Sequence, residues 1–172
     1  MQGSVMTKPV ATRRQIVATG LVLASGLPGT AFAKTAASPP EIAKRFAATL
    51  SAHDIDAFSA LFSDRYINHQ TSAAAPAPAN VTPKQASVAF FKARLTGMPD
   101  LKVGIETMVA SGDRVAASFV YTGTHGGVYF GVQPTGKPLR FTSCDIFRIH
   151  DGLIAEHWGM GDIAGVLAQL RG

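Results

Sequence analysis

Residues 141–160 read FTSCDIFRIHDGLIAEHWGM, with apolar and polar side chains alternating on both sides of an Asp-Gly pair. This period of two predicts two β-strands joined by a hairpin turn. In the first strand, Asp145 points to the same side as three large apolar residues, Phe141, Phe147 and Ile149. A carboxylate on such a face is strongly unfavourable unless it is paired or hydrogen-bonded. We therefore expect Asp145 to have a polar partner.

That partner depends on the register of the hairpin. If residues 150–152 form a three-residue loop, Asp145 lies opposite His157. If residues 151–152 alone form a type I′ turn, the register slips and Asp145 lies opposite Trp158. We favour the three-residue loop, because it gives the carboxylate an imidazole partner. The resulting pair is either an acid/base unit or a structural hydrogen bond inside a core, and spacing alone leaves both open.

The preceding sequence predicts helices before the sheet. Ser38 and Glu41 form a capping box around two prolines, and Ile42, Phe46 and Leu50 continue at helical spacing. Two more helices are expected from their caps and apolar faces: one after Asp54 with Ile55, Phe58, Leu61 and Phe62, and one after Thr82 with Val88, Phe91 and Leu95. Strands are expected at 101–110, 114–124, 139–150 and 153–160, and a closing helix at 162–170. Helices followed by an antiparallel sheet predict an α+β fold.

Residues 1–33 have the three parts of a secretory signal. Arg13 and Arg14 precede an apolar run at 18–27, and an Ala-x-Ala cleavage site ends at Ala33. Adjacent arginines before a weakly hydrophobic stretch are typical of the twin-arginine export route. About ten apolar residues are too few to cross a hydrocarbon core of roughly 30 Å. We therefore expect a periplasmic or secreted mature protein without a membrane segment, consisting of a short tail at 34–38 and one domain at 39–172.

Charge and cysteine content exclude several classes of protein. The chain has 172 residues and a formal charge of +5, but three basic residues lie in the first 33 positions, which hold no acidic residue. The remainder carries 13 Lys and Arg against 11 Asp and Glu, a net charge of +2, without the basic stripe of a nucleic-acid-binding protein. The single cysteine, Cys144, cannot form a disulfide within the chain, and in an apolar strand we expect it to be buried.

Two further histidines are candidates for a binding site. His69 ends the extended segment that begins at Tyr66 and precedes an Ala/Pro-rich loop at 71–80, so it can face a pocket mouth. His125 closes a strand before two glycines that allow close backbone approach. Each can equally be an ordinary loop histidine. No His or Cys spacing is typical of a metal site, and the sequence has no P-loop, nucleophile elbow or dinucleotide-binding motif.

Four segments, in this order, resemble the SnoaL-like polyketide cyclase family: 62–69 (FSDRYINH), 98–101 (MPDL), 123–136, and 145–162 with its DGLIAEHW run. The resemblance implies the cone-shaped fold of the nuclear transport factor 2-like superfamily. In that fold, helices pack on a curved, mainly antiparallel sheet around a largely apolar cavity, often in a homodimer. It also implies ring closure by intramolecular aldol condensation, with an aspartate moving the proton and with neither metal nor organic cofactor.

The resemblance also suggests roles for the polar residues. Asp145 and His157 would form the acid/base pair. The residues expected to shape and orient a hydrophobic, carbonyl-bearing small molecule are Tyr66, His69, His125 and Trp158. One position departs from the family pattern, because many members read Glu-His-Trp-Asp where this chain has Gly159 after the tryptophan. A periplasmic protein that binds a small molecule without turnover is therefore the alternative to an enzyme.

Overall fold

The computed structural model describes residues 1–3, 36–70 and 79–172. The chain divides into two units, Met1–Lys34 and Thr35–Gly172, and the second unit carries the helices and strands of the described residues. Apart from residues 1–3, the expected signal segment lies outside the described residues, as does most of the loop expected at 71–80.

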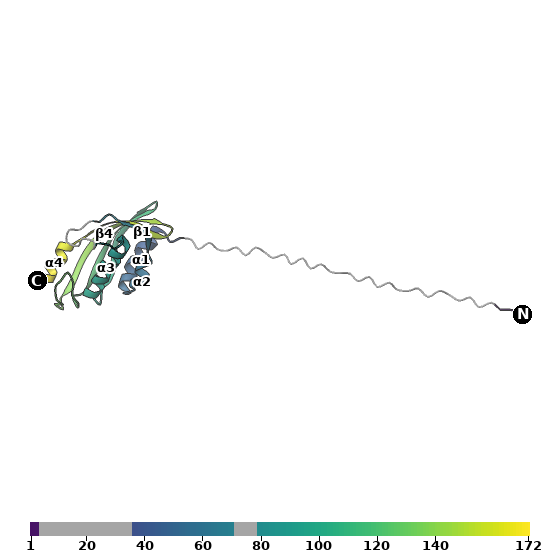
Figure 1. Ribbon diagram of the computed structural model, residues 1–172, viewed down its shortest axis with the longest axis horizontal. Helices are drawn as coiled ribbons and strands as arrows, with labels where there is room; N and C mark the ends of the chain where they lie inside the picture. Colours follow the sequence, from purple (N-terminus) through teal and green to yellow (C-terminus); the bar gives the residue numbers. More distant parts are fainter. Residues whose placement is uncertain (4–35, 71–78) are drawn as a thin grey trace. The chain divides into compact units, whose positions relative to one another are not determined.

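Three helices precede the main strands and cover one face of the sheet (Figure 1). They are α1 (Pro39–Ser51), α2 (Ile55–Ser59) and α3 (Pro83–Gly97). Their starts follow from side-chain caps, which satisfy backbone N–H groups that the first helical turn leaves free. Glu41 accepts from the backbone N–H of Ser38 at 2.8 Å, and Asp54 accepts from that of Ala57 at 2.9 Å.

The second helix is shorter than its apolar spacing predicts. It ends at Ser59, and Phe62, which we placed on its apolar face, instead opens a strand. The reason is a tertiary pairing: Phe62 lies beside Ile154 in the sheet, and the Ile154 N–H donates to Leu61 O at 2.8 Å. Pairing with the sheet therefore overrides local helical periodicity here.

The sheet has five strands in the order β1-β5-β4-β3-β2. They are β1 (Phe62–Asn68), β2 (Lys102–Ser111), β3 (Arg114–Thr124), β4 (Pro138–His150) and β5 (Leu153–Gly161). Only the β1–β5 pairing is parallel, so the sheet is mostly antiparallel, and α4 (Ile163–Arg171) follows it. This arrangement confirms the predicted α+β class.

The core lies between the helices and the inner face of the sheet. At its centre, the Phe46 ring of α1 has four aromatic neighbours at centroid distances of 5.0–5.3 Å, namely Phe58, Phe91, Phe119 and Phe147. Such pairs add to the hydrophobic stabilisation that comes from burying the rings. The inner face of the sheet is thus fixed rigidly against α1 and α3.

The β4–β5 hairpin has a two-residue turn, so the favoured three-residue loop was wrong. His150 pairs with Leu153, and Asp151 and Gly152 have φ values of 51° and 73°. Positive φ at both central positions defines a type I′ turn, which Asp-Gly strongly favours. The three-residue loop was favoured because it gives Asp145 an imidazole partner, although the Asp-Gly pair is the stronger local signal for the turn.

A β-bulge then changes the register beyond the turn. The pairing is Ile149 with Ile154 but Arg148 with Glu156, so Ala155 is the extra residue of β5. As a result Asp145 lies opposite Gly159, and His157 lies opposite Phe147. Neither expected register is therefore observed. The bulge nevertheless places His157 on the inner face with Asp145, where an uninterrupted ladder from this turn would have turned it outward.

Along β4, side chains that point to the outer face of the sheet alternate with side chains that point into the core. Asp145 is buried among the inner-face residues, whereas Cys144 is exposed. The expectation that Cys144 is buried was wrong. Side chains alternate along a strand, so Cys144 points to the outer face of the sheet, away from the inner face that holds Asp145.

Candidate functional site

The inner face of the sheet holds a buried carboxylate–imidazole pair. His157 Nε2 lies 2.7 Å from Asp145 Oδ1, and the two residues are only 4% and 5% exposed. They are diagonal neighbours in the ladder, since Asp145 faces Gly159 and His157 faces Phe147. The structure thus brings together the two residues proposed as an acid/base pair, although by a different register.

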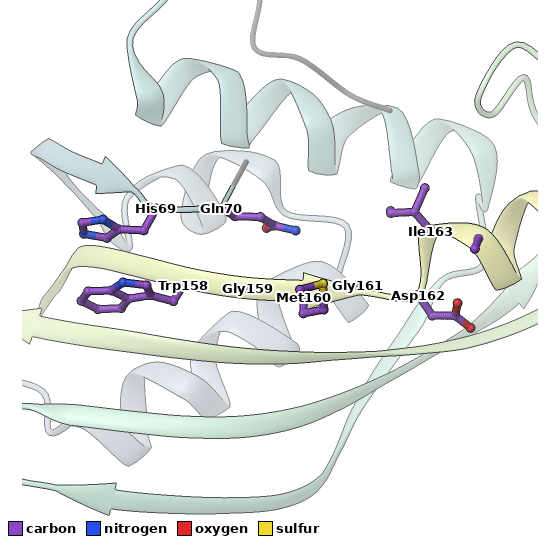
Figure 2. Close-up of a pocket in the computed structure, with 9 residues that line it drawn as sticks. His69, Gln70, Trp158, Gly159, Met160, Gly161, Asp162 and Ile163 are labelled. Atoms are coloured by element: carbon purple, nitrogen blue, oxygen red, sulfur yellow. The ribbon is translucent and has the colours of Figure 1, made fainter. Parts of the chain in front are cut away.

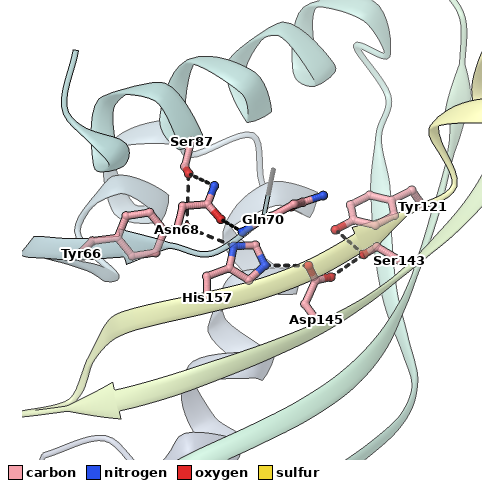
Figure 3. Close-up of polar contacts among 8 residues, drawn as sticks. All are labelled: Tyr66, Asn68, Gln70, Ser87, Tyr121, Ser143, Asp145 and His157. Atoms are coloured by element: carbon pink, nitrogen blue, oxygen red, sulfur yellow. Dashed lines mark hydrogen bonds and ion pairs between the residues drawn. The ribbon is translucent and has the colours of Figure 1, made fainter. Parts of the chain in front are cut away.

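The second oxygen of the carboxylate is also engaged. Ser143 Oγ donates to Asp145 Oδ2 at 2.5 Å, and the Tyr121 hydroxyl lies 3.4 Å from the same serine oxygen (Figure 3). Ser143 and Asp145 are two positions apart on β4, so both point inward. The carboxylate therefore has a hydrogen-bond donor on each oxygen, which holds its plane in one orientation.

The other ring nitrogen of His157 continues the network towards α3. Its Nδ1 lies 3.0 Å from the Tyr66 hydroxyl, which lies 3.2 Å from Ser87 Oγ. The amide of Asn68 also donates to Ser87 Oγ at 3.4 Å, as Figure 3 shows. The network fixes the imidazole from both sides. With Tyr66 donating to Nδ1, a neutral His157 carries its proton on Nε2 and donates it to Asp145.

Two tyrosines of this network remain neutral over a wide range of pH. Burial raises the pKa of Tyr66 to about 12, and it raises the pKa of Tyr121 to about 12 as well. The negative charge of Asp145 contributes to the raised pKa of both tyrosines, after burial. Both hydroxyls are consequently available as hydrogen-bond donors at physiological pH.

An open pocket of about 460 Å³ lies beside this network, and Gly159 is part of its lining. It is lined by His69, Gln70 and residues 158–164, which run from the end of β5 into α4 (Figure 2). A Cβ on residue 159 would stand 2.5 Å from Asp145 Oδ1, 2.6 Å from His157 Nε2 and 2.9 Å from Gln70 Oε1. Only glycine therefore allows these three side chains to pack so closely against the strand backbone.

His69 and Trp158 also line the pocket, but from the outer face of β5. Their rings are stacked with centroids 4.3 Å apart and planes 4° apart. His69 Nε2 lies 2.7 Å from Glu156 Oε2, and Arg148 Nε donates to Glu156 Oε1 at 2.6 Å. The hydrogen bonds from His69 and Arg148 hold the pKa of Glu156 below its usual value. This polar cluster fixes the wall of the pocket rather than contacting Asp145.

His125 is the one expected site residue that the structure places elsewhere. It follows the end of β3, where Thr124 pairs with Pro138, whereas Asp145 pairs with Ala117. Seven residues of strand separate these positions, a distance on the order of 20 Å. His125 is fully buried, and its Nδ1 accepts from the backbone N–H of Thr135 at 3.3 Å. In this structure, His125 belongs to the loop between β3 and β4, where its backbone bonds to Gly136 and Lys137.

The sequence interpretation missed several members of the site. Ser143 shares the inner face with Asp145, so the same alternation that selected the aspartate could have selected it. Tyr121 is on the neighbouring strand and pairs with Phe141, which required the β3–β4 register. Gln70 follows β1, and no local signal distinguishes it. Its position beside Gly159 arises only from the parallel pairing of β1 with β5.

Within the described residues, no group of three or more His, Cys, Asp or Glu side chains is placed to hold a metal ion. In the same part of the chain, no helix is both long enough and apolar enough to cross a membrane.

Comparisons with known proteins give a consistent assignment. A family model described as SnoaL-like polyketide cyclase matches residues 41–170. IdmH from Streptomyces antibioticus, a proposed polyketide cyclase, is 27% identical, with a TM-score of 0.67 and coverage of 79% of this chain and 100% of that one. AclR from Streptomyces galilaeus, a proposed hydroxylase, is 24% identical, with a TM-score of 0.68 and coverages of 77% and 80%. A proposed SnoaL-like polyketide cyclase from Jannaschia sp. CCS1 is 23% identical, with a TM-score of 0.63 and coverages of 77% and 90%. No curated protein matches significantly.

Proposed function

Since this chain belongs to the SnoaL-like polyketide cyclase family, we propose that it is an acid/base enzyme of the cyclase or isomerase type acting on a carbonyl-bearing small molecule. Asp145 and His157 move the proton, and His69 and Trp158 form one wall of the substrate pocket. One observation carries the proposal: the buried pair, with atoms 2.7 Å apart, packs directly against Gly159, and Gly159 also lines the pocket. Tyr66 positions His157 and does not contact the substrate.

The proposed chemistry begins with removal of a proton from the carbon next to the carbonyl group. The C–H bond breaks, Asp145 takes the proton, and the electron pair moves to the carbonyl oxygen to form an enolate. His157 and Ser143 hold the carboxylate in place, so its reorientation adds no cost to the step. In ring closure, the enolate carbon attacks a second carbonyl of the same molecule, a C–C bond forms, and the resulting alkoxide takes the proton back from Asp145. In isomerisation, Asp145 instead returns the proton to another carbon of the conjugated enolate. These steps need no cofactor.

The proposal is tested by proton exchange, which does not require knowledge of the natural substrate. The probe is 2-tetralone in heavy water, with loss of its C–H signals followed by NMR. We expect catalysed exchange by the wild type and a decrease of about 10²- to 10⁴-fold in Asp145→Asn, the usual contribution of a general base. Asp56→Asn, an exposed change in α2, is the matched control.

Stability must be measured in the same variants. If Asp145→Asn loses exchange but keeps its unfolding midpoint, the carboxylate acts in the reaction. A large loss of stability together with full exchange in the surviving folded fraction would make the pair structural, and the proposal would be wrong.

The second candidate function is small-molecule binding without turnover. It is favoured by the engagement of both Asp145 oxygens and by its 5% exposure, which leave little of the carboxylate free to reach a substrate. Native mass spectrometry of the purified protein separates the two. A compound that co-purifies and is returned unchanged after prolonged incubation supports binding alone, whereas its conversion supports the enzyme.

We also propose that the protein is exported and that its mature form begins near residue 34. The adjacent Arg13 and Arg14 before an apolar run support this route. Cell fractionation of wild type and an Arg13→Lys, Arg14→Lys variant tests it, since twin-arginine export should fail in the variant.

A homodimer is proposed as well, supported by the exposed apolar side chains of Ile146 and Met160 on the outer face. Native mass spectrometry of the same sample gives the oligomeric state.

A further inference from the structure

Gln70 lines the pocket but has no role in the reaction proposed above. It follows the end of β1 and is half-buried. Its side chain lies in the wall of the pocket together with Gly159. Figure 2 shows this side chain extending over β5 in the direction of Ile163, with its amide at the tip. A primary amide is thus presented to the pocket, with two N–H donors and one acceptor oxygen.

The backbone of Gln70 is held by three elements. The N–H of the preceding residue, His69, donates to His157 O of β5 at 2.8 Å. The N–H of Gln70 itself donates to Asn68 Oδ1 of β1 at 3.0 Å, and the amide of Asn68 donates to Ser87 Oγ of α3 at 3.4 Å. Within the described residues, the side-chain amide of Gln70 bonds to no other group. The side chain is therefore anchored at its base and available to a ligand at its tip.

The amide lies close to the proposed base. A Cβ on Gly159 would stand 2.5 Å from Asp145 Oδ1 and 2.9 Å from Gln70 Oε1. These two side-chain oxygens are therefore at most about 5.4 Å apart. A half-turn of the amide exchanges its oxygen and its nitrogen, so a donor can occupy either position. The carboxylate and the amide are thus neighbours beside Gly159.

This separation suits the removal of a proton next to a carbonyl group. The carbon that loses its proton and the carbonyl oxygen are about 2.4 Å apart, and a hydrogen-bonding partner approaches each to about 3 Å. A base and a donor roughly 5 Å apart therefore reach both ends of this unit from one side. As the electron pair moves onto the oxygen, a donor aimed at that oxygen stabilises the growing negative charge.

The charges around the pocket indicate which ligands it accepts. Asp162 is the carboxylate among its lining residues, and in the part of the chain that the structure describes no Lys or Arg lines it. His69 also lines the pocket, but its Nε2 lies 2.7 Å from Glu156 Oε2. Asp145 adds another carboxylate behind Gly159. An anionic ligand would meet repulsion here, whereas an uncharged carbonyl group needs only the neutral donor that Gln70 provides.

We propose that Gln70 binds the carbonyl oxygen of the ligand through its side-chain N–H, and that this ligand is an uncharged carbonyl compound and not a carboxylate. The inference rests on the proposed function, which it deepens by giving the oxygen-binding group and the charge class of the substrate. When Asp145 takes the proton from carbon, Gln70 donates a hydrogen bond to the enolate oxygen and keeps its own proton. The oxygen stays unprotonated until the electron pair returns to carbon to form the new bond.

Three naphthalenes with side groups of equal size test the binding. 2-Acetylnaphthalene offers a carbonyl oxygen, 2-isopropylnaphthalene offers none, and 2-naphthoate offers a charged group. In fluorescence titrations, Gln70→Met should weaken binding of the ketone about three- to tenfold, the usual effect of one hydrogen bond, and leave binding of the hydrocarbon unchanged. The wild type should bind 2-naphthoate more weakly than the ketone. A ketone that the wild type does not bind, an unchanged affinity for it in Gln70→Met, or a preference for 2-naphthoate would overturn the proposal.

Exchange of 2-tetralone separates binding from catalysis. Gln70→Met should lower kcat about 10²- to 10³-fold, the effect of removing one oxyanion donor, while KM rises only about three- to tenfold. Gln70→Glu, of equal size, should be as inactive, because its carboxylate repels the enolate. Gln133→Met, an exposed change between β3 and β4, is the matched control and should change neither quantity. If Gln70→Met does not fold, Gln70→Glu serves for the same comparison, and a normal kcat in the folded variant overturns the proposal.

The outcome can be separated from that of the proposed function. Asp145→Asn should lose exchange with 2-tetralone but keep the affinity for 2-acetylnaphthalene that depends on Gln70. Such an affinity in a wild type that catalyses no exchange supports the carbonyl-binding role of Gln70 and contradicts the enzyme. Full exchange in Gln70→Met supports the enzyme and contradicts the role of Gln70.

Discussion

Gly159 lies directly opposite Asp145 in the β4–β5 ladder, and a Cβ on residue 159 would stand 2.5 Å from Asp145 Oδ1. The same Cβ would stand 2.6 Å from His157 Nε2 and 2.9 Å from Gln70 Oε1, so these side chains occupy the place that a side chain at residue 159 would need. The glycine thus lets the Asp145–His157 pair pack directly against β5, beside the pocket that Gly159 helps to line.

Gly159→Ala should displace Asp145 or His157, because the new methyl group overlaps both. We expect a loss of 2-tetralone exchange of at least tenfold and a destabilisation of about 1–3 kcal/mol, typical of overpacking. Gly161→Ala is the matched control in the same strand, since its Cβ would meet Ile163 and Ser143 at ordinary distances of 3.8 and 3.9 Å. Similar losses in both variants, measured by urea unfolding and exchange, would contradict this account.

Tyr66 and Tyr121 should resist ionisation in the folded protein. Their pKa values are raised from 10.0 to about 12 by burial, so the unfolded chain releases these protons first. Their contribution to stability is complete below pH 10 and is lost as the pH rises towards 12. The expected slope is about 1.4 kcal/mol per pH unit for each tyrosine.

Absorbance at the phenolate wavelength and urea unfolding across this range provide the measurement for Tyr66 and Tyr121. Tyr66→Phe should remove one of the two late titrations and make the stability less dependent on alkaline pH. Phenolate formation by both residues close to pH 10, before any unfolding, would be inconsistent with their burial.

Asp100 should contribute stability at neutral pH that is lost in acid. Its side chain accepts from the backbone N–H and the hydroxyl of Thr124, at 2.6 and 2.8 Å. These bonds, the backbone bond first, lower the pKa of Asp100 from 3.8. A lowered pKa means that stability is fully present above the unfolded value and decreases as the pH falls through the folded one.

Asp100→Asn should therefore be less stable than wild type at pH 7, and its stability should depend less on pH below about 4. Thermal unfolding between pH 2 and pH 7 measures both effects. Asp56→Asn, whose side chain is exposed at the start of α2, is the control. A parallel pH dependence of wild type and Asp100→Asn would exclude this hydrogen-bonded carboxylate as a source of acid sensitivity.

His69→Ala should uncover the indole of Trp158, the single tryptophan of the chain. The stacked imidazole covers one face of the indole at a centroid distance of 4.3 Å. We expect acrylamide to quench tryptophan fluorescence more strongly in the variant. Since His69 lines the pocket but does not contact Asp145, KM for the exchange reaction should rise while kcat changes little. His150→Ala, at the exposed hairpin turn, should change neither quantity.

The sequence predicted the architecture well where periodicity and caps agree. The strand alternation of residues 139–150 and the caps at Ser38, Asp54 and Thr82 are local signals, and each lies where expected. The Asp-Gly turn was located correctly, but it has two residues instead of the favoured three. The end of α2 was not predictable in this way, because Phe62 leaves the helical pattern to pair with Ile154. That pairing depends on residues about ninety positions away.

The candidate site was harder to predict than the fold. Alternation correctly placed Asp145 inward, but the position of His157 depends on a β-bulge that no single residue of the sequence predicts. The groups expected to share one site lie on two faces of β5, with His157 inward and Trp158 outward.

The extra residue at Ala155 sets which side chains of β5 point into the interior, so the number of residues in this strand determines which groups face Asp145. Deleting it would exchange the faces of His157 and Trp158, so an indole would enter the interior and the imidazole would meet solvent. Every residue of β5 after the deletion would change faces in the same way, including Gly159, which packs against Asp145. Among relatives of this fold, a single-codon insertion or deletion in this hairpin is therefore a route by which the interior could change reactivity while the composition of the chain remains almost the same.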